Sequence, residues 1–282
     1  MPGKASEMSA LQVRQNPRPG SHTVGEVPGL FLYVKKDTAR VMTNESKWLI
    51  ELLTVKRGTL TPKVEFMSNQ SIIFDLDGTL LNTLQDLADS VNSVLTGRGW
   101  PEHPVAAYRY FVGDGLSMLI RRALPEHVRD QAVIDECVQA ARLEYSRRCK
   151  DTTAPYPGVL QVLKELSGKG IAMSVLSNKP HAATVEVVGH FFPGGLFQVV
   201  QGALPDQAVK PHPKPALEVA ARMGKNPKEI YFLGDSNVDM KTANSAGMIA
   251  LGAAWGFRDR EELLQAGARH ILETPLELPG YF

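Results

Sequence analysis

The sequence predicts an α/β fold in which a parallel sheet carries helices on both faces and an α-helical cap domain is inserted after the first strand. Two observations carry this prediction. From Ser71 onward, short apolar runs alternate with stretches of helical spacing, which is the pattern of βαβ units. One long segment, 82–150, breaks this alternation because its apolar residues follow helical spacing only.

The strands are expected where short apolar runs end in polar or glycine residues, and the continuous runs indicate strands buried on both faces of a Rossmann-like core. These runs are 72–74, 171–176, 197–200, 230–233 and 248–251. Helices are expected where apolar residues recur at three- and four-residue intervals, and glycines follow the two core helices as C-terminal caps. The expected helices are 159–166 and 216–223 in the core and 84–95, 115–124 and 131–148 in the insert.

Three parts of the chain are therefore expected: an N-terminal extension at 1–66, an α/β catalytic core at 67–82 and 152–282, and a helical cap at 83–151. The extension has ten basic and six acidic residues, a net charge of +4, which leaves −3 for the remainder. Its first 28 residues are polar and rich in Gly and Pro, so we expect them to be disordered. Short elements are expected at 29–34 and 47–53. Met67 precedes the first strong strand and is an alternative start.

The composition is that of an ordinary soluble globular protein. The 282 residues are 43% hydrophobic and 22% charged, with a net charge of +1, so nothing global indicates a nucleic-acid or membrane partner. No apolar run reaches the length of about 20 residues that spans a bilayer, and no secretory signal is recognisable. Cys137 and Cys149 are too few for a disulfide framework. We expect a cytoplasmic monomer or homodimer.

Two aspartates end the first strand. Asp75 and Asp77 follow the run Ile72–Phe74, and Gly78 and Thr79 come directly after them. Carboxylates two residues apart along a strand point to the same side, so one can act as a nucleophile and the other as a proton donor and acceptor. A turn with capping aspartates is the alternative interpretation. Thr79 is a candidate phosphate ligand.

Two further clusters follow later strands. Ser177 and Asn178 suit phosphate oxygens, although a helix N-cap is the preferred interpretation of this motif when it is taken alone. In the proline-rich segment 210–215, an ammonium group is able to neutralise a phosphate and a nearby aspartate. We choose Lys210 because Lys214 is expected to lie inside the next helix. The carboxyl ends of the strands in an open α/β sheet form one crevice, so these clusters are expected to converge there.

The fourth cluster is acidic. Asp235 and Asp239 lie four residues apart at the start of a predicted helix, so they share a face. An oxygen-rich site without histidine favours a hard cation such as Mg²⁺. The helix dipole alone also favours acids here. The candidate metal ligands are Asp75, Asp77, Asp235 and Asp239.

These segments together resemble a known family. The strings "FDLDGTLLNT", "LSNKP", "KPHPKP" and "GDSNVDMKTANSAGM" resemble the four ordered motifs of the haloacid dehalogenase superfamily of phosphohydrolases. Within it, "YRYFVGDGLSMLIRRAL" and "AAWGF" look like the phosphoglycolate phosphatase branch. The presence of the second aspartate of the first motif argues for phosphoryl transfer, since the superfamily's dehalogenases lack it.

The resemblance implies roles for individual residues. Asp75 looks like the nucleophile that becomes an aspartyl phosphate, and Asp77 looks like the general acid and base. Ser177 and Asn178 resemble the phosphate binders and Lys210 the charge neutraliser. The metal would be Mg²⁺, bound by Asp75, by the backbone carbonyl of Asp77 and by Asp235, with Asp239 as nearby acidic support.

The resemblance implies a Mg²⁺-dependent phosphomonoester hydrolase whose partner is a small phosphorylated metabolite, 2-phosphoglycolate in the first place. A cap residue is then expected to bind the substrate carboxylate. The candidates are Arg109, Arg121 and Arg122 near the turn at Gly113, although surface helix charge is the alternative for each arginine.

Other functions stay open. A related capped phosphatase would act on sugar phosphates, nucleotides or pyrophosphate, and a phosphomutase would transfer the phosphoryl group to a second hydroxyl. From a different class, residues 1–66 are a candidate nucleic-acid-binding module, although a charge of +4 is slight for that role. A non-catalytic interaction protein would not need all of Asp75, Asp77, Lys210 and Asp235.

Overall fold

The computed structural model describes residues 70–192 and 194–282, together with the backbone of seven short strands between residues 26 and 65. The chain forms two compact units, Met1–Met67 and Ser68–Phe282. The disorder predicted for residues 1–28 falls outside the described residues, except for the two residues of strand β1 (Glu26–Val27).

The first unit contains antiparallel strands. The larger sheet has the order β1-β2-β3-β4-β7, and β5 pairs with β6. The strand predicted at 29–34 is β2, and the element predicted at 47–53 contains β4. The bounds are β2 Leu30–Lys35, β3 Thr38–Thr43, β4 Trp48–Glu51, β5 Thr54–Lys56, β6 Thr59–Thr61 and β7 Val64–Glu65.

The second unit is built on a six-stranded sheet in the order β12-β11-β8-β13-β14-β15, in which every neighbouring pair is parallel. This confirms the α/β prediction. All five strands predicted for the core are present in this sheet, and the short sixth strand, β15, was not predicted. The bounds are β8 Ser71–Phe74, β11 Ala172–Pro180, β12 Val199–Ala203, β13 Ile230–Gly234, β14 Ile249–Ala253 and β15 His270–Leu272.

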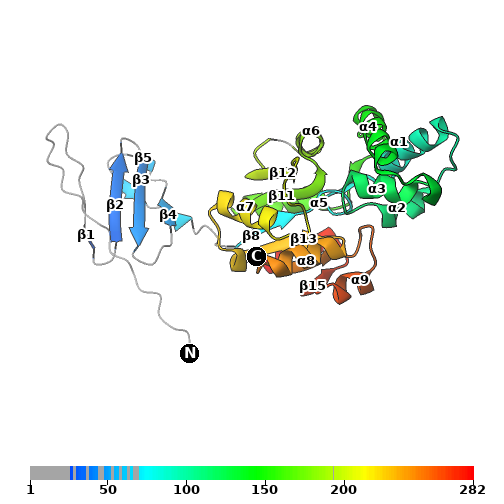
Figure 1. The fold of residues 1–282 in the computed structure, drawn as a ribbon. Helices are drawn as coiled ribbons and strands as arrows, with labels where there is room; N and C mark the ends of the chain where they lie inside the picture. The colour runs from blue at the N-terminus through cyan, green and yellow to red at the C-terminus, as the bar shows by residue number, and fades with distance from the viewer. Residues whose placement is uncertain are drawn as a thin grey trace. The chain divides into compact units, whose positions relative to one another are not determined.

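Helices cover both faces of this sheet (Figure 1). Ile72 and Phe74 of the central strand β8 pack into the cluster that contains α5 and α6, whereas Ile73 packs into the cluster of α7, α8 and α9. This alternation follows from the two-residue period of a strand. The helix bounds are α5 Val159–Gly168, α6 His181–Phe191, α7 Lys214–Met223, α8 Asn237–Ser245 and α9 Arg260–Gln265, with short 3-10 turns η2 Pro227–Glu229 and η3 Pro275–Tyr281.

Four helices lie together beside the carboxyl ends of the strands (Figure 1). They occupy the insert between β9 (Leu81–Asn82) and β10 (Ala154–Pro155), which pair antiparallel with each other. Their buried side chains join the cluster on the α5 and α6 face of the sheet, so the cap boundaries 83–151 stay a prediction. The bounds are α1 Leu84–Gly97, α2 Val105–Phe111, α3 Leu116–Ala123 and α4 Gln131–Arg148, with the 3-10 turn η1 Glu126–Val128.

A buried aspartate ties the two ends of this insert. The carboxylate of Asp86, in the first turn of α1, accepts hydrogen bonds from the backbone N–H groups of Thr152 and Thr153, both at 2.9 Å. The Thr153 hydroxyl donates to it at 2.7 Å and the Thr152 hydroxyl also donates. These bonds compensate the cost of burying the charge, and they fix where the chain returns to the core. In the part of the chain that the structure describes, no helix combines the length and apolar character needed to span a bilayer.

Candidate active site

The predicted convergence occurs at the carboxyl ends of three adjacent strands. Asp75 directly follows the central strand β8, and its backbone N–H donates to the carbonyl of Leu233 in β13 at 2.8 Å. Ser177 lies near the end of β11, and Asp235 directly follows β13. These side chains line one cavity with a volume of about 850 Å³, together with Lys210 from the loop between β12 and α7.

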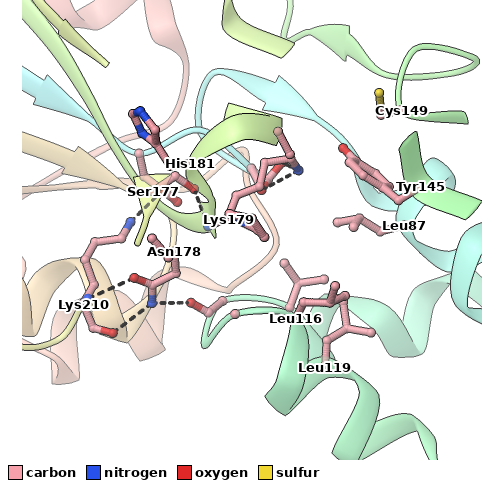
Figure 2. A pocket seen from close by; sticks show the side chains of 18 of the residues that line it. Leu87, Leu116, Leu119, Tyr145, Cys149, Ser177, Asn178, Lys179, His181 and Lys210 are labelled. Atoms are coloured by element: carbon pink, nitrogen blue, oxygen red, sulfur yellow. Dashed lines mark hydrogen bonds and ion pairs between the residues drawn. The ribbon is translucent and has the colours of Figure 1, made fainter. Parts of the chain in front are cut away.

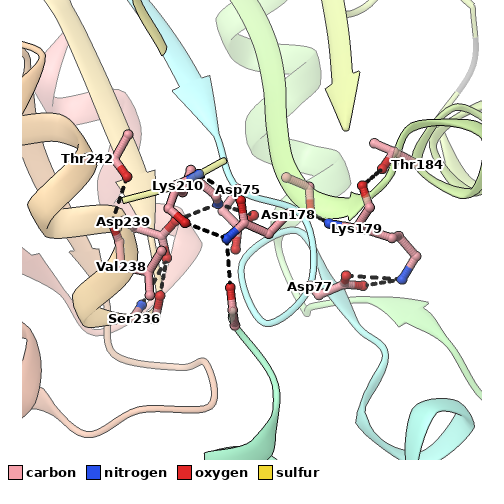
Figure 3. Close-up of polar contacts among 12 residues, drawn as sticks. Asp75, Asp77, Asn178, Lys179, Thr184, Lys210, Ser236, Val238, Asp239 and Thr242 are labelled. Atoms are coloured by element: carbon pink, nitrogen blue, oxygen red, sulfur yellow. Dashed lines mark hydrogen bonds and ion pairs between the residues drawn. The ribbon is translucent and has the colours of Figure 1, made fainter. Parts of the chain in front are cut away.

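Lys210 links two of the acidic residues (Figure 3). Its buried ammonium group donates to Asp75 Oδ1 at 2.7 Å and to Asp239 Oδ1 at 2.6 Å. Burial by itself lowers the pKa of Lys210, but Asp239 and Asp75 outweigh burial and raise this pKa above its usual value. Lys210 is therefore held as a cation within the acidic cluster.

Three carboxylates are crowded here. Asp75, Asp235 and Asp239 each offer an oxygen, and these oxygens all lie within 4.8 Å of one another. Burial raises the pKa of Asp75 to about 7, with repulsion from Asp239 acting in the same direction and Lys210 opposing both. Burial, followed by repulsion from Asp239 and Asp75, also raises the pKa of Asp235 well above its usual value. Because one ammonium does not neutralise three carboxylates, the cluster favours an additional cation.

Local hydrogen bonds fix the orientation of these acids. Asp239 Oδ2 accepts from the backbone N–H of Ser236 at 3.1 Å and from its hydroxyl at 2.6 Å, which closes a capping box at the start of α8. Asp235 Oδ2 accepts from the backbone N–H of Phe257 at 2.7 Å. Asp239 has thus committed both oxygens to the protein, whereas only one oxygen of Asp235 has a protein hydrogen-bond donor among the described residues.

The first loop approaches Asp235 so closely that only glycine fits. Gly78 has φ +89°, and a Cβ atom added to it would lie 2.1 Å from Asp235 Oδ2. Gly256 also packs against Asp235, since a Cβ atom added to it would lie 2.2 Å from the aspartate Cβ. Both glycines let backbone pack directly against the acidic side chain.

Asp77 is turned away from this cluster. Its two carboxylate oxygens accept hydrogen bonds from Lys179 Nζ at 2.9 and 3.0 Å, and Figure 3 shows this pair separate from the network around Asp75 and Lys210. Burial alone lowers the pKa of Lys179, but Asp77 and then Tyr145 outweigh it and raise that pKa. The Asp77 side chain lies outside the three-carboxylate group, and the metal contact expected from its backbone carbonyl stays a prediction.

Two predicted phosphate ligands, Ser177 and Asn178, have different surroundings in the structure. Ser177 is buried at the cavity, where its hydroxyl oxygen accepts from the backbone N–H of Lys179 at 3.2 Å. Asn178 also lines the cavity, but its side-chain amide donates to the carbonyls of Gly113 at 3.0 Å and Lys210 at 2.8 Å. Its oxygen accepts from the Lys210 backbone N–H at 2.9 Å. The Asn178 side chain therefore positions the Lys210 loop, and both of its amide hydrogens are already in use.

Thr79 does not line the cavity, and its role as a phosphate ligand stays a prediction. The side chain is fully buried and is absent from the cavity lining, and its hydroxyl has no hydrogen-bond partner among the described residues. Its backbone carbonyl accepts from Trp255 Nε1 at 2.9 Å. The turn at Gly78 directs the Thr79 side chain into the protein interior, away from the cavity.

The cavity has two different sides (Figure 2). The polar side contains Ser177, Asn178 and Lys210. The opposite side is an apolar wall from the inserted helices, formed by Leu87 of α1, Leu116 and Leu119 of α3, and Tyr145 and Cys149 of α4.

Comparison with known proteins agrees with this arrangement. The family model of haloacid dehalogenase-like hydrolases matches residues 72–253, which is more than half of the chain and includes all the strand-end residues described above. The protein belongs to the haloacid dehalogenase-like hydrolase family.

Individual relatives within the haloacid dehalogenase-like family cover the second unit. A phosphoglycolate phosphatase of Psychrobacter arcticus is 32% identical over 221 residues, which are 76% of this chain and 96% of the relative. That of Mannheimia succiniciproducens is 35% identical over 65% of this chain and 85% of the relative. A crystal structure described as a predicted phosphoglycolate phosphatase from Haemophilus somnus superposes with a TM-score of 0.70 at 26% identity, over 76% of this chain and 99% of that one.

The arginines predicted to face the substrate do not line the cavity of this haloacid dehalogenase-like chain. Arg109 donates to the carbonyls of Phe257 at 2.9 Å and Gly256 at 3.1 Å, so it fastens α2 to a core loop. Arg121 contacts Gln131 on the exposed side of α3. Arg122 donates to the Phe111 carbonyl at 2.9 Å and pairs with Asp114 at 2.5 Å. Their helices turn them toward other protein groups, whereas Gly113 does line the cavity.

Three cationic residues at the cavity were missed. Lys179 was overlooked because the strand was expected to end at 176, whereas β11 continues to Pro180, and Lys179 lines the same cavity as Ser177. Arg142 lies on α4 one helical turn before Tyr145, and it has no hydrogen bond or ion pair with a described residue. Arg258 follows β14 and donates to the Val112 carbonyl at 2.9 Å. Arg142 lies three and four residues before Tyr145 and Ser146, so the sequence indicated that these three residues share one face of the helix.

Proposed function

We propose that this protein is a Mg²⁺-dependent phosphomonoesterase that forms an aspartyl phosphate on Asp75, and that its substrate is 2-phosphoglycolate. The observation that carries the proposal is the gathering of Asp75, Lys210 and Asp235 at one cavity. A phosphoryl group bound there would contact a carboxylate nucleophile and a cation at once.

The residues divide the chemistry between them. In the first step an Asp75 oxygen bonds to phosphorus, the bond from phosphorus to the leaving oxygen breaks, and Asp77 gives a proton to that oxygen. In the second step water attacks the phosphorus, the bond to Asp75 breaks, and Asp77 takes a proton from the water. The products are the alcohol, glycolate in this case, and inorganic phosphate. Proton transfer of this kind contributes about 10²–10⁴-fold to a rate.

Binding of the phosphoryl group rests on two side chains. Ser177 offers a hydroxyl at the cavity, and Lys210 offers an ammonium already placed 2.7 Å from Asp75 Oδ1. The ammonium reduces the repulsion between a phosphate dianion and a carboxylate. The Asn178 side chain holds the Lys210 backbone in position from both its N–H and its carbonyl.

A divalent metal ion fits the donor set on charge and chemistry. Asp75 and Asp235 would hold Mg²⁺ through carboxylate oxygens, with the Asp77 backbone carbonyl as a further ligand and Asp239 in support. All three carboxylates are buried, and Lys210 is the only described residue that forms an ion pair with this group, through Asp75 and Asp239. Burial and mutual repulsion raise the pKa values of Asp75 and Asp235. Hard cations prefer such all-oxygen sites, and a bound Mg²⁺ supplies charge neutralisation for the phosphoryl group.

The choice of substrate rests on the relatives, which are named phosphoglycolate phosphatases. A second candidate is a capped phosphatase for larger esters such as sugar phosphates. The size of the cavity, about 850 Å³, favours this alternative, since pockets of roughly 300–1,000 Å³ hold drug-sized ligands. Phosphoglycolate is much smaller than that.

Phosphate release by the full chain tests the proposal. Purified protein with Mg²⁺ is assayed on 2-phosphoglycolate, glucose 6-phosphate, AMP and pyrophosphate. We expect the highest kcat/KM for 2-phosphoglycolate, loss of activity in EDTA and recovery with Mg²⁺. A preference for glucose 6-phosphate or AMP would establish the second candidate, and pyrophosphate as the best substrate would exclude both.

Asp75→Asn is the variant that separates this enzyme from a contaminant. It keeps the shape of the side chain and removes the nucleophilic carboxylate. We expect kcat to fall by about 10⁶-fold, the scale of effect when a covalent nucleophile is removed. Unchanged far-ultraviolet circular dichroism would show that the fold is retained, and normal turnover by this variant would refute the assignment.

A further inference from the structure

The proposed acid and base, Asp77, is occupied by Lys179. The ammonium of Lys179 bonds both carboxylate oxygens, and the two side chains are only 5% and 12% exposed. The pair lies apart from the network of Asp75, Lys210 and Asp239 (Figure 3). Asp77 lines the cavity, but while this pair is intact both of its carboxylate oxygens are bonded to Lys179.

Lys179 lies between the two sides of the cavity. Its Nζ is 4.3 Å from the centre of the Tyr145 ring on α4, and the residue itself lines the cavity. Figure 2 shows it between Ser177 and Asn178 on the polar side and Tyr145 and Leu87 on the apolar side. A substrate whose phosphoryl group lies at Ser177 and Asp75 would direct its leaving group toward Lys179.

The spacing suits a short substrate. Ser177 and Lys179 both belong to β11 and line the same cavity, and the Ser177 hydroxyl accepts from the Lys179 backbone N–H at 3.2 Å. The two residues are therefore neighbours, and a substrate with two anionic groups joined by one or two carbons is short enough to contact both. The apolar wall opposite offers such an anion no competing amide or hydroxyl from Leu87, Leu116 or Leu119.

The other cations at the cavity differ from Lys179. Lys210 is already committed to Asp75 and Asp239 beside the phosphoryl position. Arg258 is paired with Glu262 at 3.3 Å and with the Val112 carbonyl. Arg142 has no polar partner among the described residues, and Arg258 Nη1 is buried without a hydrogen-bond partner among them, so both arginines are rivals for binding a distant anion. Of the cavity cations in the described part of the chain, Lys179 alone contacts Asp77.

We propose that Lys179 recognises a second anionic group on the leaving part of the substrate, and that its transfer to this group releases Asp77 for proton transfer. The inference rests on the proposed function and names the residue that selects its substrate. A phosphomonoester without the second anion binds at the phosphoryl end but leaves Asp77 paired. Selection then appears in kcat as well as in KM, since the poor substrate fails to free the acid.

The test compares 2-phosphoglycolate with ethyl phosphate, which has the same two-carbon length but no carboxylate. Wild type, Lys179→Met, Lys179→Gln and Lys179→Arg are assayed as full chains with Mg²⁺. Wild type is expected to prefer 2-phosphoglycolate. In the Met and Gln variants the ratio of the two kcat/KM values falls by about 10- to 100-fold, the usual scale for one charged hydrogen bond.

Two readouts distinguish recognition from a structural role. Removing Lys179 frees Asp77, so kcat for ethyl phosphate rises in Lys179→Met, a change that loss of packing would not produce. Lys179→Arg keeps the charge and retains most of the preference. Lys179→Gln keeps a polar partner for Asp77, so the test stands if the Met variant does not fold.

Each other outcome counts against the inference. Equal loss on both substrates, or an unchanged ratio, overturns it and leaves the phosphatase proposal intact. If the preference is lost in Arg142→Gln or in Arg258→Gln but retained in Lys179→Met, the role belongs to that arginine. Equal activity of wild type on the two esters means that no second anion is recognised. If wild type hydrolyses neither ester, the proposed function fails, and this inference fails with it.

Discussion

The two sides of the cavity are built on different principles. On the core side, Asp75, Lys210 and Asp239 come from three separate segments and are joined by bonds of 2.7 and 2.6 Å. On the inserted side, the wall consists mainly of apolar side chains such as Leu87 and Leu116, which project from helices and form no hydrogen bonds. The comparison indicates that the core determines the reaction and that the helices determine what fits beside it.

The largest difference is expected between two lysines of the same loop region. Lys210→Met removes the ammonium between Asp75 and Asp239, so we expect kcat to fall by about 10²–10³-fold, as when one preorganised donor is removed from a site. Lys214→Met is the matched control, because Lys214 is 61% exposed at the start of α7 and faces Glu218 at 3.9 Å. Both variants are compared by steady-state kinetics. An equal change of kcat in both would contradict the claim that the buried Lys210 serves the reaction and the exposed Lys214 does not.

A second pair compares two glycines with positive φ. A Cβ at Gly78 would collide with Asp235, whereas Gly99, with φ +72°, has open space around it. Gly78→Ala is expected to lower kcat by about 10²-fold through displacement of Asp235. Gly99→Ala bears a similar backbone strain of about 1–3 kcal/mol but keeps its kcat. Thermal unfolding and kcat are measured for both, and a comparable loss of kcat in Gly99→Ala would count against local displacement.

Two arginines of the inserted helices, Arg109 and Arg121, provide a third comparison. Arg109→Gln loses two hydrogen bonds to the Phe257 and Gly256 carbonyls, next to Asp235, so kcat/KM is expected to fall by about 10-fold, the scale of one charged hydrogen bond. Arg121→Gln loses one exposed contact to Gln131 and is expected to behave as wild type. A stronger effect in Arg121→Gln would show that the outer side of α3 takes part in binding.

The smallest expected effect is a pH dependence of stability in the metal-free protein. The pKa of Asp75 is raised from 3.8 to about 7, so the folded protein keeps a proton that the unfolded chain loses. Stability therefore falls as the pH rises from about 4 to about 7. Thermal unfolding in EDTA is expected to show this decline, a shallower decline in Asp75→Asn, and stabilisation by Mg²⁺ at pH 7. Equal slopes in the two proteins would exclude Asp75 as a contributor.

Much of the core was predictable because a strand ends where its apolar run ends. The runs before Asp75 and Asp235 gave the position of both acids, and parallel topology brought them to one edge. Lys179 was missed because β11 continues through polar residues to Pro180, which an apolar run does not reveal. The burial of the Thr79 side chain was not predictable, since its direction depends on the turn at Gly78.

The inserted side was harder to predict for a physical reason. Which face of a helix meets the cavity depends on how that helix packs, and a rotation exchanges one set of side chains for another. Arg121 and Arg122 therefore looked as suitable as Arg142, although only Arg142 faces the cavity. Asn178 was predicted as a phosphate ligand, and only the long-range contact to the Lys210 backbone reveals that its side chain is in use.

The most direct test of the central claim is chemical trapping of the phosphorylated residue. The enzyme is denatured during turnover of 2-phosphoglycolate and treated with borohydride, which reduces an aspartyl phosphate to homoserine, and the modified position is identified by peptide mass spectrometry. The account predicts homoserine at residue 75, dependent on substrate and absent from Asp75→Asn. Homoserine at residue 77 or 235, or an unmodified chain at a time when phosphate is being released, would contradict it.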